Sequence, residues 1–265
     1  MKIFNKISAI ALACIALTAC NEVDPDDRFE ELPAVSCKRT VLLEEFTGQG
    51  CRNCPDAHRQ VADLHEQYGE LLVSVAIHAG PFGMAEGSLG DQFQGLMMVP
   101  DGDEYAKAWN IPEYPGFIVN RRSGALRLNE NWTGWIRNEL TRESPIELAV
   151  KAHIDDDGNI AIETDVKGLS AVKGKLQLWI TESSIKSFQV DNGKHLTDYE
   201  HNHVYRASVN GLWGEELSLN NSEERVLSHS YTPRDIWVKS NLAVVAFVYT
   251  DADGVLQAAE CKVTE

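Results

Sequence analysis

Hydrophobic positions follow two different patterns along the chain, and the change falls near Pro145. Before it, apolar stretches typical of strands alternate with segments in which apolar side chains recur every three or four residues, as on one helix face. A strand is expected from Thr40 to Phe46 and a helix from Pro55 to Tyr68. Pro55 suits the first helical turn, and Gly69 suits the end of the helix.

The alternation continues to residue 142 and predicts the element order β-α-β-α-β-β-α for the first part of the chain. Its later members are a strand at 71–77, a helix near 103–109, strands at 117–120 and 125–129, and a helix at 132–142. Strands that alternate with helices are typical of an α/β domain. We expect this domain to cover residues 37–144.

From Pro145 onward, short alternating strands are separated by turns rich in aspartate and glycine. Examples are strands at 146–154 and 160–166 around the turn 155–159, and strands at 242–250 and 255–263 around the turn 251–254. The pattern predicts an all-β sandwich of the immunoglobulin-like kind over residues 145–265. Neither turn has the spacing of a calcium loop, and Asp-Gly is common in β-hairpins, so we favour hairpin turns.

The start of the chain predicts export and a lipid anchor. The apolar run from Ile7 to Leu17 follows two lysines and is too short to span a bilayer, but it has the length of a signal-peptide core. The run ends in Leu-Thr-Ala-Cys20, which resembles the lipobox of bacterial lipoproteins. We expect residues 1–19 to be removed and Cys20 to anchor the protein in a membrane. A secretory signal with an incidental cysteine is the alternative.

Residues 20–36 are acidic, contain Pro25 and Pro33 and have few apolar side chains, so they predict a solvated tether. An acidic stretch behind the lipid-bearing cysteine resembles the signal that sends some lipoproteins of anaerobes to the cell surface. A plain spacer that its charge keeps extended is the other interpretation, and both stay open.

The overall charge limits the partners of the protein. The chain has 24 basic and 40 acidic residues and a formal net charge of −16. Removal of residues 1–19 takes away two lysines and no acid, so the charge becomes −18. Such a surface repels phosphate backbones, and nucleic acid is not expected as a partner.

Cys51-Arg-Asn-Cys54 stands between an expected strand and an expected helix, a context in which a Cys-x-x-Cys pair has a redox meaning. Unpaired N–H groups and the helix dipole stabilise a thiolate at a helix start. We expect Cys51 to be exposed and reactive and Cys54 to be shielded. Arg52 favours the thiolate and is a candidate for substrate binding. The Arg-Asn pair between the cysteines gives no value for the reduction potential.

The strand, loop, cysteine pair and helix resemble the thioredoxin superfamily over roughly residues 38–142. The resemblance implies a cis-proline that faces the cysteines, for which Pro115 is the candidate, with the Tyr114 backbone aligning a bound peptide. It also implies a buried acid six residues before the first cysteine, which takes the proton of the second thiol. Glu45 holds that position; Glu44 competes for the role, and a polar place on an edge strand is the alternative for Glu45.

Three histidines are further candidates for a role in function. His78 ends an expected strand at the same edge of the sheet as the cysteine loop, where it could tune the thiol or contact the substrate. A structural role is the alternative. His201 and His203 could share a strand face, a spacing that permits metal binding, but two histidines without a third ligand favour a structural or recognition role. We expect neither a metal nor another cofactor.

Several short motifs resemble the twenty-eight-kilodalton outer-membrane lipoprotein family of Gram-negative anaerobes. They are Glu44-Glu-Phe-Thr-Gly48 before the cysteine pair, His78-Ala-Gly-Pro-Phe82, His201-Asn-His203-Val-x-Arg206 and Gly211-x-Trp-Gly-Glu215. The resemblance covers nearly the whole mature chain. It implies a thioredoxin-like domain followed by a β-domain, on an outer-membrane lipoprotein at the periplasmic face or the cell surface.

Two functions compete at this point. The first is thiol–disulfide exchange with protein thiols or disulfides of the envelope or the outside, carried out by Cys51, Cys54, Glu45 and Pro115. The second is binding or adhesion, with the thioredoxin fold as a scaffold and the cysteine pair as an inert bridge. Fold does not decide between them, because function resides in the site.

Two further cysteines, Cys37 and Cys261, remain once Cys20 is acylated and the Cys-x-x-Cys pair has formed. In an oxidising compartment an even number of cysteines is compatible with a disulfide, which would tie the two ends of the folded chain together. Two buried free cysteines that pack as small hydrophobic residues are the alternative.

Overall fold

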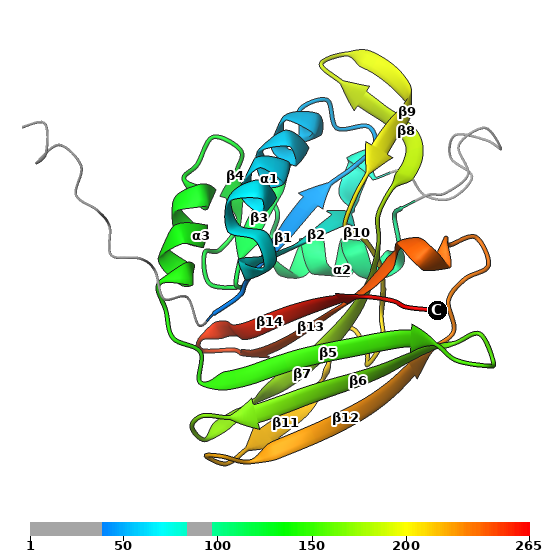
Figure 1. The fold of residues 1–265 in the computed structure, drawn as a ribbon. Helices are drawn as coiled ribbons and strands as arrows, with labels where there is room; N and C mark the ends of the chain where they lie inside the picture. Colours follow the sequence, from blue (N-terminus) through cyan, green and yellow to red (C-terminus); the bar gives the residue numbers. More distant parts are fainter. Residues whose placement is uncertain (1–38, 84–96) are drawn as a thin grey trace, which may run out of the picture. The chain divides into compact units, whose positions relative to one another are not determined.

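The computed structural model describes residues 39–83 and 97–265, which form a β-rich fold with three sheets (Figure 1). The elements of the first part follow the predicted order β-α-β-α-β-β-α. They are β1 (Val41–Thr47), α1 (Cys54–Tyr68), β2 (Leu72–His78), α2 (Pro100–Ala108), β3 (Gly116–Val119), β4 (Leu126–Arg127) and α3 (Trp132–Leu140).

The part after Pro145 consists of strands, joined by turns and one short 3-10 helix at Lys239–Asn241. The strands are β5 (Ile146–Ile154), β6 (Ile160–Gly168), β7 (Val172–Glu182), β8 (Ile185–Asp191), β9 (Lys194–His201), β10 (Val204–Ser208), β11 (Glu215–Leu219), β12 (Glu224–Tyr231), β13 (Leu242–Thr250) and β14 (Gly254–Lys262).

Strand β1 lies inside the largest sheet, between β2 and β3, and all seven of its residues are buried. It runs parallel to β2, with Thr47 opposite His78, and antiparallel to β3. The carboxyl ends of β1 and β2 therefore meet at one edge of the sheet. The chain leaves β1 at this edge and enters the cysteine loop.

Helix α1 packs an apolar face that includes Val61 and Leu64 against the residues of β1 that share its core. Pro55 lies in its first turn, and Gly69 follows its last residue with a φ of 54°, both as the sequence predicts. The helix begins at Cys54, so Cys51 lies in the preceding turn.

Strands from both sides of Pro145 share the largest sheet, whose order is β14-β13-β7-β10-β2-β1-β3-β4, with β11 pairing to β7. Strand β10 joins β2 through the pair Val204 and Ala76. Beside it, the N–H of Ala76 donates a 2.8 Å hydrogen bond to the carbonyl oxygen of His203. The division into domains 37–144 and 145–265 remains a prediction.

The second sheet, in the order β12-β6-β5, shares an apolar core with part of the largest sheet. Ile146 and Ile162 on its strands pack in one cluster with Leu178 and Val244 from β7 and β13. Two sheets that enclose such a core are in keeping with a sandwich-like second part. The immunoglobulin-like topology stays a prediction.

The third sheet is the hairpin of β8 and β9, which the hydrophobic pattern does not predict. Figure 1 shows it in yellow, extending from the strands of the second part towards the region of α1. Strand β9 consists mostly of polar residues and therefore has little apolar pattern of its own. Most of its residues are exposed or partly exposed. Contacts with the cysteine loop, described below, hold the hairpin in place.

Candidate functional site

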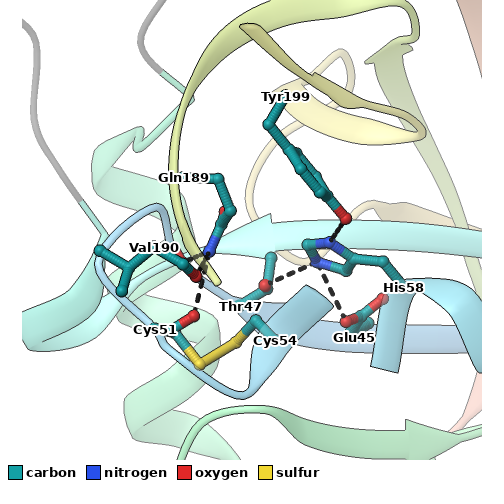
Figure 2. Close-up of a disulfide and its surroundings, with 9 residues drawn as sticks. Glu45, Thr47, Cys51, Cys54, His58, Gln189, Val190 and Tyr199 are labelled. Carbon is teal, nitrogen blue, oxygen red and sulfur yellow. Dashed lines mark hydrogen bonds and ion pairs between the residues drawn. A yellow bond between two sulfur atoms is a disulfide. The ribbon is translucent and has the colours of Figure 1, made fainter. Parts of the chain in front are cut away.

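Cys51 and Cys54 form a disulfide at the start of α1, with their Cα atoms 5.4 Å apart (Figure 2). The turn is closed by the N–H of Cys51, which donates to the carbonyl oxygen of Gly48 at 3.0 Å. The chain geometry after β1 therefore brings together the two cysteines that the sequence singles out.

The expected difference in exposure between the two cysteines is absent. Cys51 is 2% exposed and Cys54 is 0% exposed. The prediction that Cys51 is exposed was wrong, because it was based only on the loop and the helix that follows it. Residues of the β8–β9 hairpin also pack on this loop.

Backbone hydrogen bonds join the hairpin to the cysteine loop at two points. The N–H of Val190 donates to the carbonyl oxygen of Gln49 at 2.8 Å, and the N–H of Asn192 donates to that of Arg52 at 3.1 Å. Because these donors belong to β8 and to the turn after it, the loop is held from outside by a distant segment of the chain.

Two buried glutamine side chains add to this contact. Nε2 of Gln189 donates to the carbonyl oxygen of Cys51 at 3.0 Å (Figure 2). It also donates to the carbonyl oxygen of Gly48 at 3.3 Å. In the opposite direction, Nε2 of Gln49 donates to the carbonyl oxygen of Phe188 at 2.8 Å. The interlocked amides fix the conformation of the loop that carries Cys51.

The two neighbouring glutamates of β1 have different surroundings, because successive residues of a strand point to opposite faces. Glu44 is fully buried and forms an ion pair with Arg121, with 3.2 Å between Oε1 and the guanidinium. Glu45 is 3% exposed, and its Oε1 accepts no hydrogen bond within the described part of the chain. Burial raises the pKa of Glu45 to about 8.

His58 on α1 links Glu45 to the hairpin. Its Nε2 lies 3.4 Å from Oε1 of Glu45 and 3.0 Å from Oγ1 of Thr47. Its Nδ1 lies 2.8 Å from the hydroxyl oxygen of Tyr199 on β9 (Figure 2). Burial, with a smaller effect of the Arg59 charge, lowers the pKa of His58 to about 4, so the ring is neutral at neutral pH.

Sequence reasoning missed both His58 and Tyr199. The position of His58, four residues after Cys54 on the same helix, was a signal that could have revealed it, because such residues share a helix face. Tyr199 had no such signal, since only the folded hairpin brings it to the site.

Two more histidines lie beside this group. His78 is 1% exposed, and neither of its ring nitrogens has a hydrogen-bond partner among the residues described. Its ring meets that of His201 edge-on, with 5.5 Å between centroids, and His201 lies 6.4 Å from the ring of His58. Burial lowers the pKa of His78 and brings that of His201 to about 3.

His203 faces a different neighbour from His201. Its ring stacks on that of His65 on α1, with centroids 4.8 Å apart, and its Nδ1 lies 3.9 Å from a carboxylate oxygen of Glu260. In residues 39–83 and 97–265, no three histidine, cysteine, aspartate or glutamate side chains are placed to hold a metal ion.

A cavity of about 380 Å³ lies between α1, β2 and the end of β9. Its lining includes Glu45, His58, His78, Tyr199 and His201. The acid, the histidines and the tyrosine thus line one cavity.

The remaining predicted site residues are Tyr114, Pro115 and Arg52, and none of them lines the cavity of about 380 Å³. Tyr114 and Pro115 are joined by a cis peptide bond immediately before β3. Tyr114 lines a second cavity, of about 680 Å³, together with Phe82. The carbonyl oxygen of Phe82 accepts a 3.0 Å hydrogen bond from Gly50, which connects this cavity to the cysteine loop. Arg52 is exposed to solvent.

The other cysteines are only partly covered by the structure. Cys20 and Cys37 lie outside the described residues. Cys261 on β14 has no disulfide partner within them, and burial raises its pKa to about 11. The bridge between Cys37 and Cys261 therefore stays a prediction. No helix in the described ranges is long and apolar enough to cross a membrane.

These observations define a β-rich protein in which a disulfide lies close to a buried acid and a group of histidines. The chain belongs to the family of outer membrane protein Omp28, whose family model matches residues 102–265. This confirms the family inferred from the motifs and the expected location as an outer-membrane lipoprotein. The match begins after the cysteine pair, so it does not cover Cys51 and Cys54.

Two solved structures from Porphyromonas gingivalis are similar to this chain. HBP35 aligns over 86% of this chain and 76% of its own, with a TM-score of 0.67 and 18% identity, a likeness of fold only. A domain of the outer membrane lipoprotein Omp28 aligns over 46% of this chain and 89% of its own, with 23% identity. Its TM-score of 0.33 is too low to carry a structural argument. No curated protein matched the chain.

Proposed function

We propose that this outer-membrane protein carries out thiol–disulfide exchange on envelope or extracellular proteins. The observation that carries the proposal is the placement of the Cys51–Cys54 disulfide beside a buried acid, Glu45 (Figure 2). Its raised pKa lets Glu45 hold or release a proton near neutral pH, as a general acid or base does.

The proposal includes a thioredoxin-like domain at residues 37–144. Three features support it: the sheet order β2-β1-β3-β4, the parallel pairing of β1 with β2, and the cis bond between Tyr114 and Pro115 just before β3. The cysteine pair at the end of β1 and the start of α1 agrees with the same interpretation.

In the reducing direction, the Cys51 thiolate attacks one sulfur of a substrate disulfide and releases the other substrate sulfur as a thiolate. Cys54 then gives its proton to Glu45, attacks the sulfur of Cys51 and releases the second substrate thiolate. Two electrons pass to the substrate, and the Cys51–Cys54 disulfide is the oxidised product. A dithiol protein of the envelope has to reduce this disulfide before the next turnover.

Other residues of the site assist binding in this proposal. Exposed Arg52 favours the Cys51 thiolate, and the Tyr114 backbone, with Pro115, aligns the substrate chain beside the cavity of about 680 Å³. His78 is 1% exposed, which fits a role in tuning the site better than direct contact with a protein substrate.

The second candidate function is binding or adhesion with an inert disulfide. One observation favours it: Cys51 is 2% exposed, and the hairpin is hydrogen-bonded to its loop through Gln189. In this case the disulfide would only staple the loop at the start of α1.

The reduction potential of the Cys51–Cys54 pair, measured together with insulin reduction, separates the two candidates. For exchange we expect a potential above about −300 mV, the level below which structural disulfides typically lie. We also expect insulin reduction that disappears in Cys51→Ser and persists in Cys261→Ser. A potential below this level and no insulin reduction would favour the inert disulfide.

A trapping experiment tests the same proposal in cells. Cys54→Ser leaves Cys51 able to form a mixed disulfide but unable to resolve it, so envelope proteins should accumulate as covalent adducts that a reductant releases. The double variant Cys51→Ser/Cys54→Ser is the matched control. Abundant Cys54→Ser protein without adducts would count against exchange.

A further inference from the structure

We propose that His58 and Tyr199 form the path by which the proton leaves Glu45 for solvent. The inference rests on the proposed function, in which Glu45 takes the proton of Cys54. It adds a role for the β8–β9 hairpin, which would supply the outer end of a proton path that starts on β1.

Glu45 lies at the inner end of the path, isolated from solvent. The side chain is buried, and its Oε1 accepts no hydrogen bond from any described residue. The imidazole Nε2 of His58 lies 3.4 Å from Oε1. Distances of this length between catalytic groups are common before substrate binds and shorten during reaction.

The position of the proton on the His58 ring decides whether the ring can take a second proton from Glu45. With the proton on Nδ1, this nitrogen donates to the hydroxyl oxygen of Tyr199 at 2.8 Å, while Nε2 accepts from the hydroxyl of Thr47 at 3.0 Å. The single lone pair of Nε2 is within reach of both the Thr47 hydroxyl and Oε1 of Glu45. When the Thr47 hydroxyl rotates away, this lone pair is free to accept the proton of the carboxyl group.

Tyr199 is the outer member of the path. His58 and Tyr199 are both partly exposed, whereas Glu45 is buried, so these two side chains connect the buried carboxyl group with the surface of the protein. Burial raises the pKa of Tyr199 to about 12, which keeps the hydroxyl protonated and able to pass a proton on. The hairpin thus supplies a hydroxyl group at the edge of the cavity that Glu45 lines.

The protons balance along this path. The carboxyl proton of Glu45 passes to Nε2 of His58, the Nδ1 proton passes to the oxygen of Tyr199, and the hydroxyl proton of Tyr199 passes to water. Glu45 becomes a carboxylate, and His58 and Tyr199 stay neutral. A neutral relay suits a partly buried histidine whose pKa is about 4, because it avoids an imidazolium ion.

Other charged or titratable groups near the path have to be considered in any pH profile. They are Arg59 and His65 on α1, His78 on β2, Asp191 on β8, and Glu200, His201 and His203 on or beside β9. The histidines whose pKa is lowered, His58, His65, His78 and His201, are neutral above pH 6.5, so profiles recorded from pH 6.5 to 9 report on Glu45 and on the thiols of Cys51 and Cys54.

The test uses the reduced protein and a chromogenic aromatic disulfide that releases one thiolate when Cys51 attacks and a second when Cys54 resolves the mixed disulfide. In Tyr199→Phe and His58→Ala, the first release should keep its rate, and the second should slow about tenfold. Tyr231→Phe, a tyrosine on β12, is the matched control and should leave both rates unchanged.

Added imidazole distinguishes a relay from a structural role. The cavity of about 380 Å³ has room for this molecule, so imidazole should restore most of the second release in His58→Ala and none of it in Cys54→Ser. The pH profile of that release in Tyr199→Phe should become dependent on buffer concentration, whereas the wild-type profile should not.

The outcomes separate the two proposals. If the wild-type protein shows both releases and the second keeps its rate in His58→Ala and Tyr199→Phe, the relay is wrong and the proposed exchange stands. A slowed second release that imidazole leaves unchanged would also overturn the relay. If the wild-type protein shows no release at all, the proposed exchange itself fails.

Discussion

The side-chain amide of Gln189 donates a hydrogen bond to the carbonyl oxygen of Cys51 at 3.0 Å, across 138 positions of the sequence. The same amide reaches the carbonyl oxygen of Gly48. One side chain of the hairpin therefore holds both ends of the turn that precedes α1. Access to the disulfide depends on this contact as well as on the cysteine loop itself.

Replacement of Gln189 by alanine should make the disulfide easier to reach. The variant loses two hydrogen bonds to the cysteine loop, each worth roughly 1 kcal/mol net, so the rate of reduction by a small dithiol should rise by at least about fivefold. The rate can be followed by quenching with a thiol-specific label. Gln60→Ala, at an exposed glutamine of α1, is the control. Equal rates in Gln189→Ala and the wild-type protein would show that the hairpin does not restrict access.

Glu45 should make the protein less stable as the pH rises. Its pKa is about 8 in the folded state against 4.5 for the unperturbed group, so the folded state binds the proton more tightly than the unfolded state. Stability that is present below pH 4.5 is then lost progressively up to about pH 8. Between pH 6.5 and 8 the wild-type protein should lose roughly 2 kcal/mol of unfolding free energy.

Glu45→Gln tests this prediction, because the amide cannot ionise. Urea unfolding at several pH values should give a nearly constant free energy for the variant over this interval. The control Glu66→Gln, at an exposed position on α1, should keep the slope of the wild-type protein. A slope that persists in Glu45→Gln would mean that another group is responsible.

The core of the first part was predictable because its signals are local. The apolar run of β1, Pro55 at the start of α1 and Gly69 at its end all act within a few residues. The same holds for the turns of the second part. Helix α2 begins at Pro100, earlier than the expected start near Asp103, since proline fits a first helical turn.

The candidate site was predictable only in part. The cysteine pair and Glu45 stand in one short segment with a recognisable spacing. The hairpin could not be predicted, because β9 carries polar, exposed residues and its position depends on bonds such as that between Val190 and Gln49. Tyr199 therefore became a site residue only in the folded protein.

Buried and partly buried histidines should make the protein sensitive to acid. His58, His65, His78 and His201 all have a pKa lowered by burial, to about 4 in His58 and His65 and about 3 in His201. The unfolded state takes up their protons first as the pH falls below 6.5, so stability that is complete above 6.5 is lost towards pH 4. Glu45 acts in the opposite direction over this range, because the folded state holds at most one proton more on Glu45 than the unfolded state does.

In His201→Gln, the number of protons taken up on unfolding should fall by about one. The slope of the unfolding free energy against pH should then decrease by roughly 1.4 kcal/mol per pH unit between pH 6 and 4.5. The measurement is urea unfolding at each pH, with His195→Gln, at an exposed position on β9, as the control. The explanation fails if both variants keep the same slope as the wild-type protein.

Glu44 and Arg121 should stabilise the protein only when both are present. Both side chains are buried, and the guanidinium lies among five aromatic rings, the nearest being Tyr249 at 4.5 Å. The others belong to Trp109, Trp179, Trp213 and Phe247. Despite Arg121, burial raises the pKa of Glu44, so the carboxylate depends on its partner.

Arg121→Met should lower the unfolding free energy by about 3–5 kcal/mol at neutral pH, because it leaves the Glu44 charge buried without a partner. The loss should shrink at acid pH as the carboxyl group becomes protonated. The double variant Glu44→Gln/Arg121→Met should recover most of the loss, since it removes both charges while keeping similar volumes. If the double variant is as unstable as Arg121→Met, the destabilisation comes from lost contacts with the aromatic rings and not from the unpaired charge.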